Sequence, residues 1–402
     1  MSKVFLTPLL PFVSACLYGD AASFYAHLNE AERTELESQG KTLGMTAWFY
    51  RYLLDVLPEG KRQAFQKVYW LRKVRALSEE HELNRLCSVL RKSGLRFALI
   101  KGADLAYRLY PDPALRPHGD WDIWFHPDDC ELALEKLAED NWDTSVQYTD
   151  HQVFSEVFDA ARKINEHHFF PHVRGGYIVE PHFTLPNFAN VDPHELWAYT
   201  VEYREGGQHI LSPELNLLML TRHVASKAYF HANIPKLLTD AAVVMQGETV
   251  DFAMLCEMAA RWRLPYSGDL LAAFREFFPS DVVSGFRADP EETSRFRTLF
   301  EKRAALDKPQ NISLEMNWSH AKGKSIQILW DHVRNGGPKK MRCWYHLPKR
   351  GAWLRVGWAF VRYYCSQIWG VVCSELRHDK ALRDYCIMVE DLESNAAAKR
   401  KI

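Results

Sequence analysis

Residues 95–125 read LRFALIKGADLAYRLYPDPALRPHGDWDIWF, and the fold and the candidate site are organised around this stretch. The apolar run Leu95–Ile100 predicts a short strand with both faces buried, which indicates a central place in a small sheet. A second strand is predicted over Gly119–Phe125. Because successive side chains of a strand point to opposite faces, Asp120 and Asp122 share one face of this second strand.

The two carboxylates suggest a cation. Like charges that lie so close cannot both stay ionised in a dry pocket, so they share a proton or hold an ion. Paired aspartates suit Mg²⁺ or Mn²⁺, hard ions that bind through a few carboxylates and substrate phosphates. The pattern therefore predicts phosphoryl or nucleotidyl transfer, and the alternative is an exposed strand with two solvated aspartates.

The segment between the two strands carries groups that suit phosphate. Gly102 permits close backbone approach, and a helix predicted over Ala103–Tyr110 would turn its first N–H groups towards an anion. Lys101 is a phosphate-binding candidate, with an ordinary solvated lysine as the alternative. Arg116 lies four residues before Asp120 and offers a planar fork to phosphate oxygens. The alternative for Arg116 is a salt bridge to the aspartates themselves.

A hairpin is predicted further along the chain. The run His167–His172 is followed by the turn Gly175-Gly176 and by a strand over Tyr177–Leu185. Glu180 and His182 share a face of that strand, and an ordinary exposed strand residue is the alternative for Glu180. The histidines of this region match no zinc-ligand spacing.

Helices are predicted on both sides of this core. Ser78, followed by two glutamates, predicts a helix start, and the helix should stop at Ser93-Gly94. Ser212-Pro213-Glu214 predicts another helix start, and a further helix is expected from about Pro235. Lys236 and Asp240 lie four apart on that helix, where they can pair with each other.

The order of strand, Lys101-Gly102 turn, helix, Arg116-Pro117 and Asp120-x-Asp122 resembles the nucleotidyltransferase superfamily named for DNA polymerase beta. Within that superfamily it is most similar to the uncharacterised nucleotidyltransferase family of bacterial gene clusters, over roughly residues 75–245. The resemblance implies an α+β fold with a small mixed β-sheet core flanked by N- and C-terminal helical domains.

The resemblance also implies roles for named residues. Asp120 and Asp122 would bind the metal, and Glu180 would be the third ligand and the general base. The implied nucleotide-binding residues are Lys101, Gly102, Arg116, His182 and Lys236. If the strands Gly119–Phe125 and Tyr177–Leu185 are neighbours, they lie about 4.8 Å apart and the three carboxylates meet. The opposite face would then be apolar, formed by Trp121, Ile123, Val179 and Phe183.

The implied activity is metal-dependent transfer of a nucleoside monophosphate from a triphosphate such as ATP. The acceptor would be a small molecule, a glycan or a protein. The superfamily has Gly-Ser or Gly-Gly after its first strand, whereas this chain has Lys101-Gly102-Ala103, and Asp120 follows Gly102 by 18 positions. This departure supports the alternative of a non-catalytic scaffold, or of a protein that docks on membranes or nucleic acid.

The composition sets the domain organisation and the compartment. The 402 residues suffice for several domains, which we predict at 1–93 (helical), 94–210 (α/β core), 211–310 (helical) and 311–402 (basic, aromatic and helical). The net charge of −1 produces no global field for nucleic acid. The eight cysteines show no C-x-x-C pair, which argues against zinc ribbons and disulfide frameworks and favours a reducing compartment.

The two ends of the chain bear on localisation. Residues 332–374 contain no Asp or Glu but many Arg, Lys, Trp and Tyr, so they could dock an anionic membrane surface, nucleic acid or an acidic partner. The alternative is a buried aromatic helical pair. The segment before Cys16 resembles a lipoprotein signal, yet Pro8 and Pro11 interrupt it. We predict a cytoplasmic protein without a spanning helix, and peripheral membrane attachment is an option.

Overall fold

The structure is a computed structural model that describes residues 8–144, 167–169, 171–186, 188, 191–228, 234–262, 264 and 294. The predicted basic, aromatic region 311–402 lies outside the described residues, as does most of the segment 143–166, for which the sequence predicts no element. The division into four domains therefore stays a prediction.

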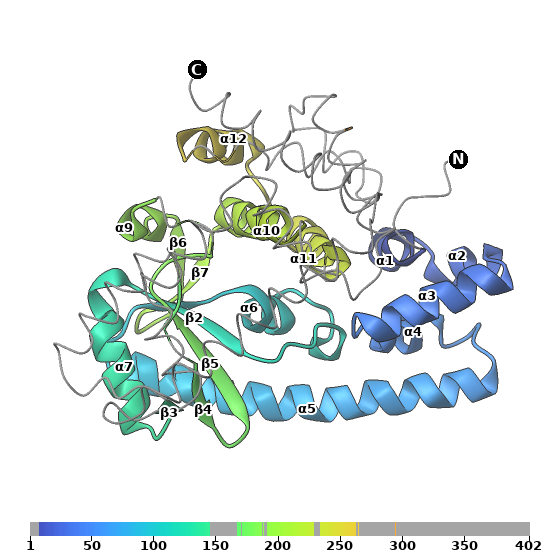
Figure 1. Cartoon of the computed structure of the whole chain (residues 1–402), viewed down its shortest axis with the longest axis horizontal. Coiled ribbons are helices and arrows are strands. Elements are labelled where there is room, and N and C mark those ends of the chain that lie inside the picture. The colour runs from blue at the N-terminus through green and yellow to red at the C-terminus, as the bar shows by residue number, and fades with distance from the viewer. Residues whose placement is uncertain are drawn as a thin grey trace, which may run out of the picture.

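Along the chain, one group of described helices precedes the first strand and another follows the last strand, and α6, α7 and α9 lie between strands (Figure 1). They are α1 (Leu9–Tyr18), α2 (Ala21–His27), α3 (Glu30–Thr42), α4 (Thr46–Leu53), α5 (Glu59–Lys92), α6 (Lys101–Arg108), α7 (Cys130–Glu139), α9 (Pro193–Trp197), α10 (Pro213–Ala228), α11 (Ile234–Gly247) and α12 (Phe252–Arg261), with the 3₁₀ turns η1 (Pro113–Leu115) and η2 (Pro127–Asp129).

The strands form one mixed sheet. They are β1 (Phe97–Leu99), β2 (Trp121–Phe125), β3 (Asp143–Thr144), β4 (His172–Arg174), β5 (Tyr177–His182), β6 (Thr200–Arg204) and β7 (Gln208–Leu211). Their order is β3-β4-β5-β2-β1-β7-β6. The pairs β2·β5 and β1·β7 are parallel, and the other neighbours are antiparallel. A mixed sheet flanked by helices confirms the predicted α+β architecture.

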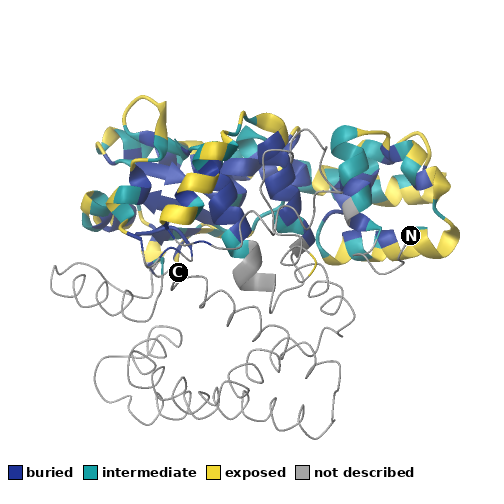
Figure 2. Ribbon diagram, turned by 90° about the horizontal axis from the view of Figure 1, so that it is seen from above, coloured by how far each residue is buried: buried dark blue, intermediate teal, exposed yellow. Residues whose placement is uncertain are grey.

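The central strands explain why their sequences are apolar on both faces. β1 and β2 lie inside the sheet and are buried along their whole length. Figure 2 shows this buried centre, and the edge strand β6 is by contrast mostly exposed. The predicted central position of the first strand is therefore confirmed. The hairpin is confirmed as well, because Gly175 and Gly176 join β4 to β5 with φ of 57° and 87°, a conformation that suits glycine.

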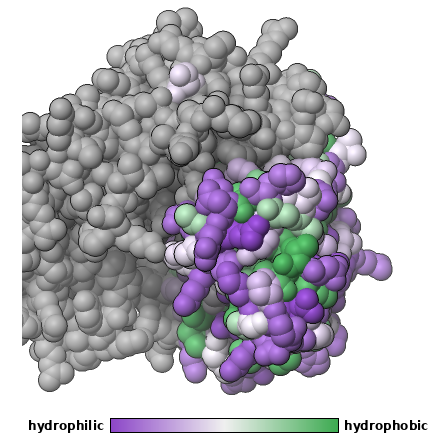
Figure 3. Space-filling view, turned by 90° about the vertical axis from the view of Figure 1, so that its right-hand side faces the viewer, coloured by the Kyte–Doolittle hydropathy of each residue, from purple (hydrophilic) through white to green (hydrophobic). Residues whose placement is uncertain are grey.

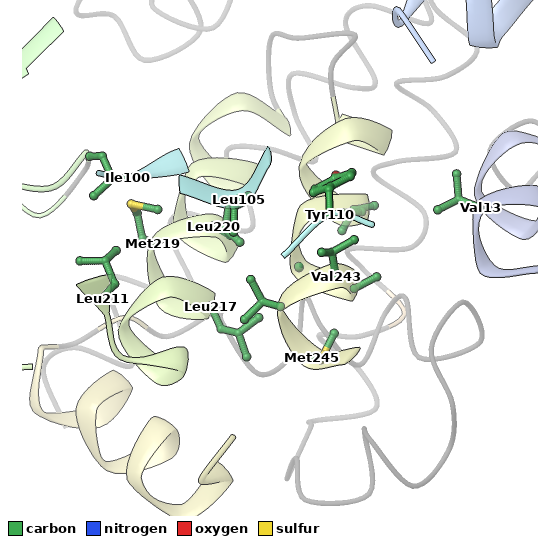
Figure 4. Packing of buried hydrophobic residues seen from close by; sticks show 14 of the residues in the cluster. Val13, Ile100, Leu105, Tyr110, Leu211, Leu217, Met219, Leu220, Val243 and Met245 are labelled. Atoms are coloured by element: carbon green, nitrogen blue, oxygen red, sulfur yellow. The ribbon is translucent and has the colours of Figure 1, made fainter. Parts of the chain in front are cut away.

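Two hydrophobic clusters cover the two faces of the sheet. Below it, the C-terminal half of α5 and α7 pack against Trp121, Ile123, Val179 and Phe183, so the predicted apolar underside is confirmed. Above it, the N-terminal helices, α10, α11 and α12 share one cluster with the opposite side of β1 and β2. Figure 4 shows part of this second cluster, where side chains of α10 and α11 pack together.

One predicted helix boundary is wrong. α5 is continuous over 34 residues from Glu59 and does not start at Ser78. Good helix formers fill residues 61–77, so no local break separates the two halves. The Ser78 hydroxyl instead lies 2.8 Å from the Tyr177 hydroxyl of β5. The predicted end of the helix, at Ser93, is confirmed.

The later helices begin close to where the sequence predicts them. α10 starts at Pro213, and the Ser212 hydroxyl accepts a hydrogen bond from the Leu215 amide at 3.3 Å. α11 starts at Ile234. The described helices include none that is both long and apolar enough to cross a bilayer. The outer face of the N-terminal helices mixes hydrophilic and hydrophobic residues (Figure 3).

Candidate active site

The site is built on the parallel pairing of β2 with β5. In this register Asp122 lies opposite Glu180, and Trp124 lies opposite His182. The two runs are thus neighbouring strands, as the sequence analysis required. Because opposite residues of neighbouring strands project to the same side, backbone hydrogen bonds fix the carboxylates of Asp122 and Glu180 beside each other.

Three side chains converge on one point above the sheet. One ligand atom each from Asp122, Glu180 and His182 lies within 4.8 Å of the others. Oδ1 of Asp122 accepts a hydrogen bond from Nε2 of His182 at 2.8 Å and another from Nζ of Lys101 at 2.7 Å. Within the described residues, the second oxygen of Asp122 makes no hydrogen bond.

The carboxylates of the site differ in their electrostatic balance. Burial opposes ionisation of Asp122, but Lys101 and His182 hold the pKa of its carboxyl well below the usual range. Burial and the nearby Asp122 raise the pKa of Glu180 and that of Asp120. Lys101 lowers the pKa of both groups, and a backbone hydrogen bond lowers that of Asp120, but these effects do not offset the burial and the repulsion. A half-buried group of acids with too few cations is the arrangement that a divalent ion completes.

His182 is held in its neutral form. Burial first, and Lys101 second, lower the pKa of this imidazole to about 4. Because the Asp122 carboxylate accepts at Nε2, the proton sits on that nitrogen, and Nδ1 carries the lone pair. Nδ1 is buried and has no hydrogen-bond partner within the described residues. A neutral imidazole is the form that binds metals, so His182 can join the donor set once its proton moves from Nε2 to Nδ1, or once its ring turns to present Nδ1.

Asp120 lies beside this group but outside its closest set. It immediately precedes β2, on the same side as Asp122, and the two carboxylates interact electrostatically. Its oxygens are not among the ligand atoms that lie within 4.8 Å of one another. The tightest cluster therefore combines two predicted metal ligands with His182, which the sequence analysis assigned to the nucleotide.

Lys101 and Gly102 open α6 next to the acids. Lys101 has a φ of 54°, a left-handed conformation that costs a residue with a side chain about 1–3 kcal/mol. A Cβ on Gly102 would lie 2.9 Å from Cβ of His118, so His118 packs closely against this glycine, and the approach of a phosphate to Gly102 stays a prediction. α6 starts at Lys101 rather than at Ala103, and the amide of the preceding Ile100 donates to the backbone carbonyl of Asp122 at 3.1 Å.

Arg116 has a different partner from the predicted one. Its Nε and Nη2 donate to the two oxygens of Asp240 at 2.6 and 2.7 Å, and its Nη1 donates to the carbonyl of Pro117. The alternative of a salt bridge to the site aspartates is therefore wrong, and contact with a phosphate stays a prediction. The guanidinium is buried, and three of its five N–H groups are engaged by Asp240 and Pro117. Contact with a phosphate would have to use the remaining N–H groups.

Lys236 is also placed differently. Its Nζ donates to the carbonyl of Pro117 at 2.6 Å, and Asp240 pairs with Arg116, so the predicted Lys236–Asp240 pair is wrong. Burial first, and the Arg116 cation second, lower the pKa of Lys236 to about 8. Lys236 lies near enough to Asp120 to interact with it electrostatically, which leaves it beside the candidate site.

Three further residues around the site escaped the sequence analysis. The buried Asp240 accepts from Arg116 and from the Tyr110 hydroxyl. The His118 ring packs edge-on to Tyr107 and interacts electrostatically with Asp122. His167 lies with its ring 5.2 Å from that of His182. Asp240 and His167 are brought in by long-range contacts, for which no local pattern gives a signal, whereas His118 lies only two residues before Asp120.

A second group of possible ligands, His126, Asp128 and His194, lies at the end of β2. Here a guanidinium is already present, because Arg96 contacts Nε2 of His126 at 3.2 Å and pairs with Asp128 and Asp129. Asp129 immediately precedes α7, but its carboxylate binds Arg96 and does not cap that helix. This cluster is thus balanced by its own cation and differs from the acid-rich site.

A mixed sheet that brings acids of two parallel strands together beside a Lys-Gly turn defines a protein of the nucleotidyltransferase class. The family model described as "Uncharacterised nucleotidyltransferase" matches residues 24–273, more than half of the chain. The protein belongs to this family. Neither the curated proteins nor the solved structures gave a match.

Proposed function

We propose that this protein is a metal-dependent nucleotidyltransferase that moves a nucleoside monophosphate from a triphosphate onto an acceptor. The observation that carries the proposal is the group of Asp122, Glu180 and His182, whose ligand atoms lie within 4.8 Å of one another. Membership of the nucleotidyltransferase family supports the reaction class. The acceptor would offer a hydroxyl or a phosphate oxygen.

The donor set fits a divalent ion. Asp122 and Glu180 supply oxygens, and His182 supplies a nitrogen from a buried imidazole. Asp120, which is half-buried and interacts electrostatically with Asp122, would complete the shell. When bound, the metal would neutralise charge on the phosphates and orient the attacking and leaving oxygens. An imidazole among the ligands suits Mn²⁺ at least as well as Mg²⁺.

The residues of the chain divide the remaining work. Lys101 and the first N–H groups of α6 would bind triphosphate oxygens, which is supported by the start of this helix at Lys101, next to Asp122. Glu180 carries the raised pKa expected of a base that accepts the proton of the attacking hydroxyl. In the transfer, the acceptor oxygen forms a bond to the α-phosphorus, the bond from that phosphorus to the bridging oxygen breaks, and pyrophosphate leaves.

The test is pyrophosphate release from each of the common nucleoside triphosphates with Mg²⁺ or Mn²⁺, with and without cell extract as a source of acceptor. Wild-type protein should release pyrophosphate, whereas Asp122→Asn and Glu180→Gln should lose at least about 100-fold in rate. Asp112→Asn is the matched control. Asp112 also accepts from a lysine, Lys73 at 3.0 Å, but lies outside the site.

The outcomes separate the proposal from its rival. Full activity in Asp122→Asn would reject the assigned site. A folded wild-type protein that releases no pyrophosphate with any triphosphate would favour the non-catalytic scaffold. Steeply salt-dependent binding to anionic liposomes or to oligonucleotides would then support docking through residues 332–374.

A further inference from the structure

Lys101 holds the position at Asp122 that a metal would need. Its Nζ lies 2.7 Å from Oδ1 of Asp122, and its side chain is only 18% exposed. Asp122 is the member of the acid group common to the metal cluster and to the lysine contact. We propose that Lys101 is a built-in substitute for the metal, which occupies the acid group until a metal–nucleotide complex displaces it. This inference rests on the proposed function.

The ion and the ammonium compete for the same carboxylate. Oδ1 of Asp122 already accepts from both Lys101 and His182, which leaves little room for a third partner on that oxygen. A divalent ion bound to Oδ1 would face the ammonium across a single oxygen, and an ion bound to the other oxygen, Oδ2, would still meet its repulsion across one carboxylate. The lysine therefore has to withdraw before Asp122 can hold the ion tightly.

Lysine suits such an exchange. Its ammonium is a compact charge on a flexible four-carbon stem, so it can swing away without moving the backbone. An arriving triphosphate offers the ammonium a new set of anionic partners close by. The left-handed backbone of Lys101, with a φ of 54°, is rarely adopted by residues with side chains and persists where the surroundings determine it. The stem is thus anchored at the turn while its end is free to exchange.

The exchange would couple the two ligands of the site. In the absence of nucleotide, the metal competes with the ammonium and binds weakly. With a triphosphate present, the ammonium of Lys101 pairs with the phosphates, and the acid group is then free to bind the metal. Metal and nucleotide then bind with positive cooperativity, because each removes an obstacle to the other.

The experiment measures Mn²⁺ binding without nucleotide, from the electron paramagnetic resonance signal of the free ion. Lys101→Met should bind Mn²⁺ about ten- to a hundred-fold more tightly than the wild type, since one charge-assisted contact no longer has to be broken. Lys101→Gly is a second variant that accepts the positive φ without strain, which protects the test against misfolding. Lys236→Met is the matched control: it removes the same charge near the acids without touching Asp122, and should change the affinity far less.

The outcomes distinguish this inference from the proposed function. Equal or weaker Mn²⁺ binding in both Lys101 variants, relative to the wild type, would overturn the substitution. An equal gain in Lys236→Met would also overturn it, because the effect would then be one of general charge. If neither wild type nor variants bind Mn²⁺ at millimolar concentration, the metal site and with it the proposed function fail. Tight binding by the Lys101 variants supports the substitution even if no turnover is found.

Discussion

Replacement of Arg116 by methionine should destabilise the protein strongly. Arg116 makes two charge-assisted hydrogen bonds to Asp240, at 2.6 and 2.7 Å, and the Asp240 side chain is completely buried. In Arg116→Met the carboxylate would keep only the Tyr110 hydroxyl as a partner. Removal of one member of a buried ion pair costs about 3–5 kcal/mol, because the other charge stays buried without compensation.

The assay is urea unfolding followed by circular dichroism. With an m value of about 3 kcal/mol/M, the loss should lower the midpoint by about 1–1.7 M. Arg261→Met is the control, because Arg261 contacts Glu195 at a similar distance of 2.8 Å but at the surface, where a pair contributes at most about 1 kcal/mol. In the double variant Arg116→Met/Asp240→Leu, much of the loss should be recovered, since no charge remains buried.

A small effect would refute this reasoning. If Arg116→Met unfolds within about 0.3 M urea of the wild type, the pair is solvated and Arg116 is free for another partner. Loss of nucleotide binding with unchanged stability would restore the role that the sequence alone assigned to Arg116, namely contact with phosphate.

Two further predictions concern stability. Burial, and the Arg116 cation after it, lower the pKa of His118 to about 4, so between this value and the usual pKa of about 6.5 the unfolded state binds one proton more than the folded state. The free energy of unfolding should therefore fall by up to about 3 kcal/mol as the pH drops from about 6.5 to about 4. His118→Gln should flatten this part of the pH profile of the unfolding midpoint. Gly207→Ala should lower the free energy of unfolding by at least about 2 kcal/mol, because the φ of Gly207 is 94° and a Cβ would lie 2.5 Å from the backbone oxygen of Leu95. Gly206→Ala, which has a similar φ and no clash with the backbone, should lower it less. Equal losses in the two variants would contradict the role of the clash.

The parts of the fold that follow from local patterns were predictable. The alternation of Trp121, Asp122 and Ile123 determines which side chains face the apolar underside and which face the site. The turn at Gly175-Gly176 and the start of α10 carry chemistry that acts within a few residues. These signals need no knowledge of the tertiary structure, because the residues involved interact with their own backbone or alternate along a strand.

The misses have a common physical cause. Ser78 followed by acids is a sound local start signal, but a helix that already runs through it needs no cap. Lys236 and Asp240 are well spaced for a helical pair, yet Asp240 is taken by Arg116, which lies 124 positions away. Which side chains pair over such long stretches of chain depends on how the helices and strands pack. The spacing of neighbouring residues in a single sequence does not show this packing.

The unbroken α5 imposes a condition on the length of the chain. Its 34 residues span about 51 Å. Its middle is tied to Asp112 through Lys73 at 3.0 Å, and its last turns carry Leu86 and Leu90 under the sheet. One residue inserted between these two attachments would rotate the last turns of α5 by about 100° relative to Lys73 and shift them by about 1.5 Å along the helix axis. Insertions of about seven or about eleven residues, which make two or three turns, restore the helical phase to within about 20°, so this spacer is expected to change length in such whole-turn steps or not at all.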